Sequence, residues 1–225
     1  MFKGIFIAVG FILTIISSGY VFASINITDW KDNGLTQWEA KEFSGNSLYK
    51  VMQYKDKTSL QALSDNSASG LVLTQKIDLL DNPYLNWSWL IEKKLTGLNE
   101  REKAGDDFVA RIYVVIEGGF LVWKTKSLNY VWSSNQPKGQ SWNNPFAPSN
   151  VKMMSVRGNE SETGKWYQEK RNVYQDLIDI FGDKGSDKEN QKSYQYIDVI
   201  AIMTDSDNSG KNAESYYGDI IFTQQ

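Results

Sequence analysis

Cysteine and histidine are both absent from this sequence of 225 residues. The absence of cysteine excludes disulfide bonds, so the packed core alone must stabilise the folded chain. The absence of histidine excludes Ser-His-Asp triads, histidine-ligated zinc and histidine general bases. Any catalysis would therefore have to use carboxylates, Tyr, Lys, Arg, Ser or a hard metal ion.

Long apolar runs are scarce, and the one at the N-terminus has the features of a secretory signal peptide. A positive charge at Lys3 precedes the apolar residues 4–16, and mostly small or polar residues follow up to Ala23. This order predicts cleavage after Ala23, whereas a membrane-spanning helix needs about 20 apolar residues. We expect residues 1–23 to be a signal peptide and residues 24–225 to form a single secreted or periplasmic domain without a stable membrane span. An uncleaved membrane anchor is the alternative.

The charge balance is mildly acidic. The full sequence has 24 basic and 27 acidic side chains, and removal of Lys3 with the signal peptide changes the formal charge from −3 to −4. Proteins that bind nucleic acid carry an excess of basic side chains on one face. Nucleic acid is therefore not expected among the partners.

Short β segments separated by polar, glycine-bearing turns follow one another along the chain. We predict strands at residues 48–54, 59–63, 70–77, 84–91, 108–117, 128–133, 151–157, 166–173, 196–204 and 217–223. Many short strands at this spacing favour a β-sandwich or barrel over a βαβ fold. The expected fold class is all-β, a β-sandwich of the jelly-roll type.

One short helix and three long loops complete the expected fold. Apolar side chains recur at the i, i+3, i+4 and i+7 spacing of a helix at Tyr174, Leu177, Ile178 and Phe181, and Gly182 follows as a C-terminal cap. Polar loops are predicted at residues 96–105, 135–150 and 182–193. Aromatic side chains in the middle loop either form a rim that faces a ligand or pack back onto the body.

The most informative segment covers residues 196–222. Its first strand is apolar at nearly every position from Ile197 to Met203, which is typical of a central strand buried on both faces. The acidic turn from Asp205 to Gly210 follows, and it matches the first half of a calcium loop, with oxygen ligands at positions one, three and five and glycine at six. The second half fails, because Tyr216 stands at position twelve, where a bidentate Glu is required.

A hard cation such as calcium could still be held by Asp205, Asp207 and Asp219. The alternative is a turn of Asp, Asn, Ser and Gly whose side chains hydrogen-bond their own backbone. The sequence leaves both interpretations open.

Strand alternation predicts a second cluster of polar side chains. Asp107, Arg111 and Tyr113 share the face of their strand that lies opposite the apolar one. Glu169 and Arg171 share a similar face of the strand at residues 166–173. If both strands lie in one sheet, these side chains meet and could bind sugar hydroxyl groups or act in catalysis. The alternative is an arginine–carboxylate network that only fixes the sheet.

Tryptophan positions divide into two groups. Trp87 and Trp89 share a face with Leu85 and Ile91, which favours a place in the core over a sugar platform. Trp132 lies near a strand end, and we expect it to stack against a sugar ring.

Several ordered motifs are similar to those of a known family. They are GDDFVARIYV at residues 105–114, YVW at 130–132, EKRNVYQD at 169–176 with FG at 181–182, IAIMTDSDN at 200–208 and YGD at 217–219. Together they resemble the uncharacterised family known as domain of unknown function 3047, over most of residues 38–223. The resemblance implies an exported bacterial protein without an established activity. The strand order also resembles, at the level of fold, the opening of jelly-roll carbohydrate-binding modules.

The expected function is that of a non-catalytic envelope protein that binds a glycan or a similar polar small molecule. One alternative is a carboxylate-dependent hydrolase or lyase that acts on polysaccharide, with Asp107 and Glu169 as acid and base and Arg111 and Arg171 as anion stabilisers. Another alternative is a purely structural envelope protein. An open groove lined by these side chains would favour binding or catalysis, and their burial beneath loops would favour the structural role.

Overall fold

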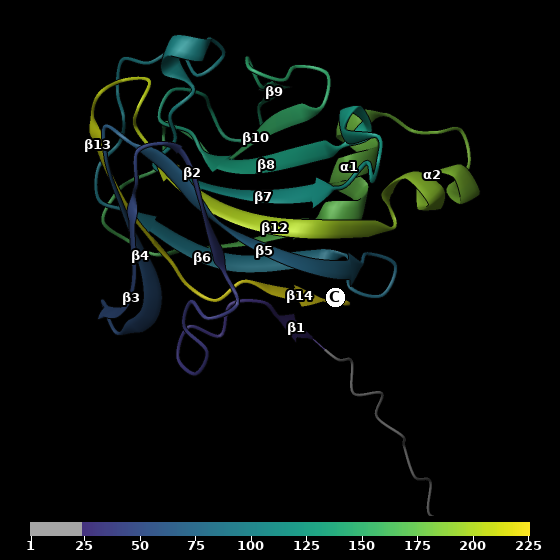
Figure 1. Ribbon diagram of the computed structural model, residues 1–225, viewed down its shortest axis with the longest axis horizontal. Coiled ribbons are helices and arrows are strands. Elements are labelled where there is room, and N and C mark those ends of the chain that lie inside the picture. Colours follow the sequence, from purple (N-terminus) through teal and green to yellow (C-terminus); the bar gives the residue numbers. More distant parts are fainter. Residues whose placement is uncertain (1–23) are drawn as a thin grey trace, which may run out of the picture.

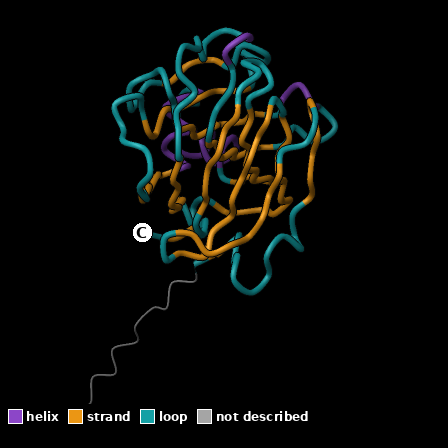
Figure 2. Tube along the Cα trace, turned by 90° about the vertical axis from the view of Figure 1, so that its left-hand side faces the viewer, coloured by secondary structure: helices purple, strands orange, loops and turns teal. Residues whose placement is uncertain are grey.

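The computed structural model describes residues 24–225, and the predicted signal peptide at residues 1–23 lies outside the described residues. Two seven-stranded sheets pack face to face (Figures 1 and 2). Sheet A has the order β1-β14-β6-β13-β4-β3, with β11 also paired to β6, and sheet B has the order β2-β5-β12-β7-β8-β10-β9. The predicted all-β class and the jelly-roll type of sandwich are confirmed.

The strands of sheet A are β1 (Ile25–Asn26), β14 (Ile221–Thr223), β6 (Tyr84–Ile91), β13 (Asn212–Tyr217), β4 (Lys57–Asp65), β3 (Leu48–Tyr54) and β11 (Tyr167–Asn172). Those of sheet B are β2 (Glu39–Ser44), β5 (Ala68–Asp78), β12 (Tyr196–Asp205), β7 (Ala110–Ile116), β8 (Lys126–Trp132), β10 (Val151–Arg157) and β9 (Ser141–Asn143). All pairings are antiparallel except that of β8 with β10.

Strand β12 lies in the middle of sheet B, between β5 and β7, as its apolar sequence predicts. Ile200 and Ile202 are completely buried between the sheets. Val199 and Ala201 point to the outer face, where they are only partly covered. Burial between the sheets therefore explains the apolar residues at the inward positions but not those at the outward positions.

The core between the sheets is rich in aromatic rings. Trp89 and Trp132 are fully buried with ring centroids 5.9 Å apart, and Trp87 packs against Tyr130 at 5.5 Å. Such side chains bury roughly 150–250 Å² each, so each contributes about 4–6 kcal/mol before entropy is counted. These rings stabilise a fold that has no disulfides. The core positions of Trp87 and Trp89 are as predicted.

Two α-helices lie at one end of the sandwich (Figure 1). Helix α1 (Val173–Phe181) is the predicted one, and Gly182 ends it with a φ of 92° that favours glycine. Helix α2 (Asp187–Tyr194) occupies a segment expected to be a loop. Its sequence is almost wholly polar, but the Ser186 side chain accepts a hydrogen bond from the backbone N–H of Glu189, which begins the helix.

Two single 3₁₀ turns, η1 (Lys103–Gly105) and η2 (Val122–Lys124), complete the secondary structure. None of the helices in residues 24–225 is long and apolar enough to cross a membrane. The segment 135–150, expected to be a loop, contains the short strand β9, whose Trp142 is buried against Phe108, whereas the Phe146 side chain after it is 55% exposed.

Candidate functional site

The outer face of sheet B is formed by alternate residues of its central strands. In β7, Ala110, Ile112 and Val114 are fully buried against sheet A, so Arg111 and Tyr113 point outward. Across the sheet, Arg111 pairs with Met203 of β12, and Tyr113 pairs with Ala201 of β12 and Asn129 of β8. The register therefore gathers polar and large side chains from β7, β8 and β12 on this face.

A groove runs over this outer face. It consists of two adjoining depressions of about 380 and 360 Å³, and Phe43, Tyr113 and Met203 line both of them. We call the whole depression the sheet B groove. One end is polar and includes Asp106, Asp207, Arg111, Asn129 and Asn144. The other end is mostly apolar and includes Val72, Val115, Val199 and Ala201.

Two exposed aromatic residues flank the polar end. The Phe43 side chain, on the edge strand β2, is 63% exposed, and Phe146 is 55% exposed. Both line the depression that contains Arg111. Exposed aromatic side chains beside a polar cavity are typical of ligand-binding sites rather than of a solvated surface.

Arg111 is the centre of a buried network at the polar end. It is 4% exposed and forms a hydrogen-bonded ion pair with Asp205, whose other oxygen accepts the Phe108 N–H at 3.1 Å. Asp106 lies 3.9 Å from the guanidinium and accepts hydrogen bonds from Asn144 Nδ2 at 2.9 and 3.1 Å. These contacts hold Arg111 in a fixed position at the groove.

One donor of Arg111 remains free within the described part of the chain. The Nε atom is buried and has no hydrogen-bond partner among residues 24–225. A buried donor without an acceptor costs about 1–3 kcal/mol, which an oxygen atom of a ligand or of water would recover. Arg111 lines the groove with other atoms of its side chain, whereas its Nε atom is covered from solvent.

Negative charge outweighs positive charge in this cluster. The carboxyl groups of Asp106, Asp107, Asp205 and Asp207 lie around the single guanidinium of Arg111. Burial raises the pKa of Asp205 to about 8, against the lowering effect of Arg111 and with a further increase from Asp107. Burial likewise raises the pKa of Asp106, and Arg111 opposes this increase. Burial thus makes Asp205 and Asp106 bind a proton more tightly than exposed carboxyl groups do, and the contact with Arg111 opposes this effect.

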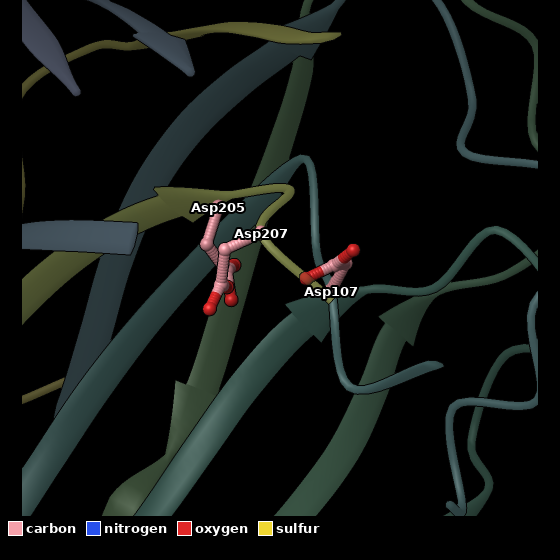
Figure 3. A group of neighbouring side chains, drawn as sticks. All are labelled: Asp107, Asp205 and Asp207. Carbon is pink, nitrogen blue, oxygen red and sulfur yellow. The ribbon is translucent and has the colours of Figure 1, made fainter. Parts of the chain in front are cut away.

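The predicted metal ligands are only partly brought together. Asp205 and Asp207 do lie close to each other, and with Asp107 they offer three oxygen atoms within 4.8 Å of one another (Figure 3). Asp219, in contrast, lies in a separate pocket beside Lys57 on sheet A and accepts a hydrogen bond from Thr28. Asp219 therefore does not join the group, and Asp107 takes its place.

Most oxygens of this carboxylate group already have partners. Asp107 accepts the backbone N–H groups of Asn208 and Ser209 at 3.1 and 2.7 Å, and both oxygens of Asp205 are hydrogen-bonded. The turn is therefore held mainly by Asp107 from outside it; the bonding of the turn to its own backbone that the alternative predicted is present at Ser209, whose Oγ donates to Ser206 O at 3.3 Å. Calcium binding stays a prediction, with Asp207 as the carboxylate that has the most free oxygen atoms.

The predicted meeting of the polar faces of β7 and β11 does not occur. The two strands lie in different sheets, since β7 belongs to sheet B and β11 pairs with β6 in sheet A. Alternation predicts which residues share a face of one strand, but not which sheet that strand joins. Asp107 and Arg111 are therefore separated from Glu169 and Arg171, and Asp107 with Glu169 does not form the predicted acid–base pair.

Glu169 and Arg171 instead connect elements of the fold. Glu169 is buried, accepts a hydrogen bond from Trp89 Nε1 at 3.1 Å, and pairs with Arg157 of β10, so it joins the two sheets. Arg171 forms an ion pair with Asp176 of α1.

Trp132 is also placed differently from the expectation. It is 0% exposed and packs against Trp89 and Tyr167, with ring centroids 5.9 and 5.2 Å apart. In β8 the alternation puts Leu128, Tyr130 and Trp132 together on the core face, which is why Trp132 cannot stack against a ligand in this structure.

Several groove residues were not predicted from the sequence, among them Phe43, Asn129, Asn144 and Met203. Phe146 belongs to the loop 135–150, whose aromatic residues were expected either to face a ligand or to pack onto the body. Phe43 lies in a strand with the sequence EAKEFS, whose charges obscure its β character. The one available signal was the single aromatic residue in that otherwise polar segment.

A family model described as "Protein of unknown function (DUF3047)" matches residues 36–221. The match covers most of the chain, which therefore belongs to this family, as the sequence motifs predicted. No curated protein matches the sequence.

Solved structures of similar fold include carbohydrate-binding modules. The family 11 carbohydrate-binding module of the cellulosomal cellulase Lic26A-Cel5E of Clostridium thermocellum is 12% identical, with a TM-score of 0.44 over 89% of this chain and 94% of that one. The family 11 module from Clostridium thermocellum in complex with a β-1,3-1,4-mixed-linked tetrasaccharide is 13% identical, with a TM-score of 0.42 over 88% and 94%.

A cellulase is among the similar structures as well. A variant of the Cel12A cellulase of Rhodothermus marinus is 8% identical, with a TM-score of 0.44 over 90% of this chain and 100% of that one. At these identities and TM-scores, none of the structures assigns a ligand or a binding residue to this chain.

Proposed function

We propose that this member of the DUF3047 family is a non-catalytic, exported envelope protein that binds a glycan or a similar polar ligand in the sheet B groove. The observation that supports this most strongly is that a depression lined by polar side chains adjoins an apolar one. The first contains the buried Arg111, the second has an apolar floor, and Phe43, Tyr113 and Met203 line both. A sugar presents both kinds of surface, hydroxyl groups at its edge and C–H groups on its faces.

The polar end offers a donor and an acceptor for ligand hydroxyl groups. Arg111 Nε lacks an acceptor, and the Asp207 carboxylate accepts no hydrogen bond from the described residues. Both residues line the same depression. Since a hydroxyl group donates one hydrogen bond and accepts others, the hydroxyl groups of a ligand suit a site that offers both a guanidinium and a carboxylate. Hydrogen bonds to charged groups contribute about 1.5–3 kcal/mol each.

The aromatic residues offer surfaces for the faces of sugar rings. Tyr113 lies in the middle of the groove, with Phe43 and Phe146 at its rim. The Tyr113 hydroxyl donates to Met203 Sδ at 3.3 Å, which holds this ring in place, so binding costs little additional side-chain entropy there.

The proposal is non-catalytic because the predicted acid–base pair is not assembled. Asp107 holds the turn after β12, and Glu169 is bonded to Trp89 and Arg157 in the other half of the sandwich. Neither carboxylate is free to transfer a proton to a ligand in the groove. Export rests on the predicted signal peptide at residues 1–23.

The test is a glycan array followed by titration of the best ligand into the parent protein and two variants, Phe43→Ala and Phe146→Ala. Each variant is expected to bind about tenfold more weakly, because an aromatic contact of this kind is worth roughly 1.4 kcal/mol. Phe120→Ala is the matched control, since Phe120 is equally aromatic and fully exposed but does not line the groove.

Two results would overturn the proposal. One is the absence of binding to any glycan by a folded parent protein. The other is release of cleaved product in a turnover assay that is run on each bound polysaccharide, since this would show an enzyme.

A further inference from the structure

The loop between β7 and β8 exposes two aromatic side chains at its tip. Phe120 is fully exposed and Trp123 is 67% exposed, and the apolar Leu121 lies between them in the sequence. Large apolar side chains clustered in this way on a surface mark an interaction site. The loop lies at the same end of the sandwich as α2, because Lys126, just after it, contacts the ring of Tyr194 in that helix.

Backbone hydrogen bonds hold this loop in shape. Leu121 N donates to Gly118 O at 3.0 Å and Lys124 N donates to Leu121 O at 2.7 Å. Asn150 Nδ2 donates to the carbonyl oxygens of Trp123 and Thr125, both at 2.6 Å. The turn depends on glycine, because a Cβ atom at Gly118 would lie 2.1 Å from Leu121 O. The aromatic tip is thus presented by an ordered scaffold.

Positive charge surrounds the base of the tip. The ammonium groups of Lys126 and Lys184 both lie over the ring of Tyr194, 5.5 and 5.4 Å from its centroid. Burial lowers the pKa of Lys126, and Lys184 and Lys124 lower it further. Within residues 24–225, none of these three lysines forms an ion pair with a carboxylate. The neighbouring acidic residues are Glu117, Asp183 and Asp198; Asp198 accepts the N–H of Glu117, and Asp183 accepts the N–H of Gly185.

We propose that this loop docks the protein onto an anionic lipid surface. Phe and Trp insert at the boundary between headgroups and acyl chains, where the Trp N–H remains hydrated. Lysines near the membrane plane are attracted to anionic headgroups, each by about fivefold in affinity. The combination of an apolar tip with unpaired lysines fits such a surface, and it is independent of the glycan proposal.

A second copy of the chain fits this loop less well. A stable protein interface buries about 800 Å² on each partner. Two aromatic side chains at a projecting tip provide roughly 300–500 Å². A lipid surface accepts a small tip, because its fluid chains close around the inserted rings.

The position of the loop leaves the polar end of the ligand site free. Strand β7 runs from Ala110, next to Arg111, to Ile116 at the base of the loop. These six steps span about 20 Å, so the polar end of the sheet B groove lies far from the loop, whereas the apolar end reaches Glu117 beside it. A membrane-docked molecule could still bind a glycan.

The test uses the lack of cysteine in the chain. A single cysteine is introduced by Phe120→Cys in the full chain and labelled with an environment-sensitive fluorophore, and a second variant, Trp123→Cys, repeats the measurement. Phe146→Cys is the matched control at another exposed phenylalanine. Vesicles of phosphatidylcholine, with and without phosphatidylglycerol, are then added.

The expected result is a blue shift at positions 120 and 123 with vesicles that contain phosphatidylglycerol, and no shift at position 146. Combining Lys124→Gln, Lys126→Gln and Lys184→Gln weakens this response about fivefold for each lysine. The fluorophore reports only on its own surroundings, so vesicle binding through another part of the chain does not produce a blue shift at positions 120 and 123.

Three results would overturn the inference. One is an unchanged spectrum at positions 120 and 123 with anionic vesicles. Another is an equal shift at position 146, which would mean that the label and not the loop binds lipid. The third is a lipid-free dimer, seen by analytical ultracentrifugation, that Phe120→Ser dissociates.

Discussion

Strands β7 and β11 carry the same kinds of residue but use them differently. Arg111 of β7 lies on the outer face of sheet B, where it lines a groove and keeps one donor without a partner in the described chain. Glu169 and Arg171 of β11 lie at the junction of sheet A with β10 and α1, where each pairs with a charge of opposite sign. The difference lies in the hydrogen bonding of these side chains: Arg111 Nε has no partner among the described residues, whereas Glu169 and Arg171 are both paired with a charge of another element.

The largest expected effect concerns the ion pair between Glu169 of β11 and Arg157 of β10. Glu169→Leu removes the acceptor of Trp89 Nε1 and leaves the mostly buried Arg157 without its partner. Breaking a buried ion pair costs about 3–5 kcal/mol, so the free energy of unfolding falls by this amount in urea titrations. Glu162→Gln, which removes an exposed ion pair with Lys165, leaves the urea midpoint unchanged.

A Glu169→Leu variant as stable as the parent protein would contradict the structural role of Glu169. Loss of affinity for the ligand of the sheet B groove, measured where this variant is still folded, would contradict the placement of the ligand site away from β11.

A second prediction concerns the pH dependence of stability. Burial raises the pKa values of Asp205, Asp106 and Glu100, so each binds its proton more tightly in the folded than in the unfolded chain. Stability therefore rises as the pH falls from about 8 towards 4, and it is lost as the pH increases through this window. The chain has no histidine, so histidine titration does not contribute to the pH dependence of stability in this window.

Thermal unfolding at a series of pH values checks this prediction. Asp205→Asn should flatten the profile, because it removes the carboxyl group with the highest pKa in the network of Arg111. A melting temperature that increases from pH 5 to pH 8 in the parent protein would contradict the account.

The smallest expected effect concerns calcium. The oxygens of Asp107 accept two backbone N–H groups, and Asp205 pairs with Arg111, so calcium should not shift the melting temperature measurably. Asp107→Ala should instead destabilise the fold by about 1–3 kcal/mol, since it frees the two N–H groups of the turn. A calcium-dependent stabilisation that Asp207→Asn abolishes would establish the metal site that the sequence suggested.

Local patterns predicted much of the fold. The alternation in β7 correctly directed Arg111 and Tyr113 away from the core, and the spacing of apolar residues correctly predicted α1. Helix α2 was missed because its sequence is polar and its only marker is the cap at Ser186.

The position of the site depends on strand pairings between distant segments, which local sequence patterns do not reveal. The assignment of β7 and β11 to different sheets rests on contacts between distant segments, as does the position of Phe43 beside Tyr113. Strand β12 illustrates the limit: its continuous apolar sequence predicted burial on both faces, but Val199 and Ala201 form the floor of a groove. An apolar ligand surface and a covered core surface have the same composition.

The most direct test of the central claim is a ligand titration that compares Tyr113→Ala with Arg171→Ala, after circular dichroism has confirmed that both variants are folded. The account predicts that Tyr113→Ala loses at least about tenfold in glycan affinity, because it removes the aromatic surface in the middle of the groove. Arg171→Ala should bind as the parent protein does. Normal binding by Tyr113→Ala together with loss of binding by Arg171→Ala would contradict the account and place the site at β11.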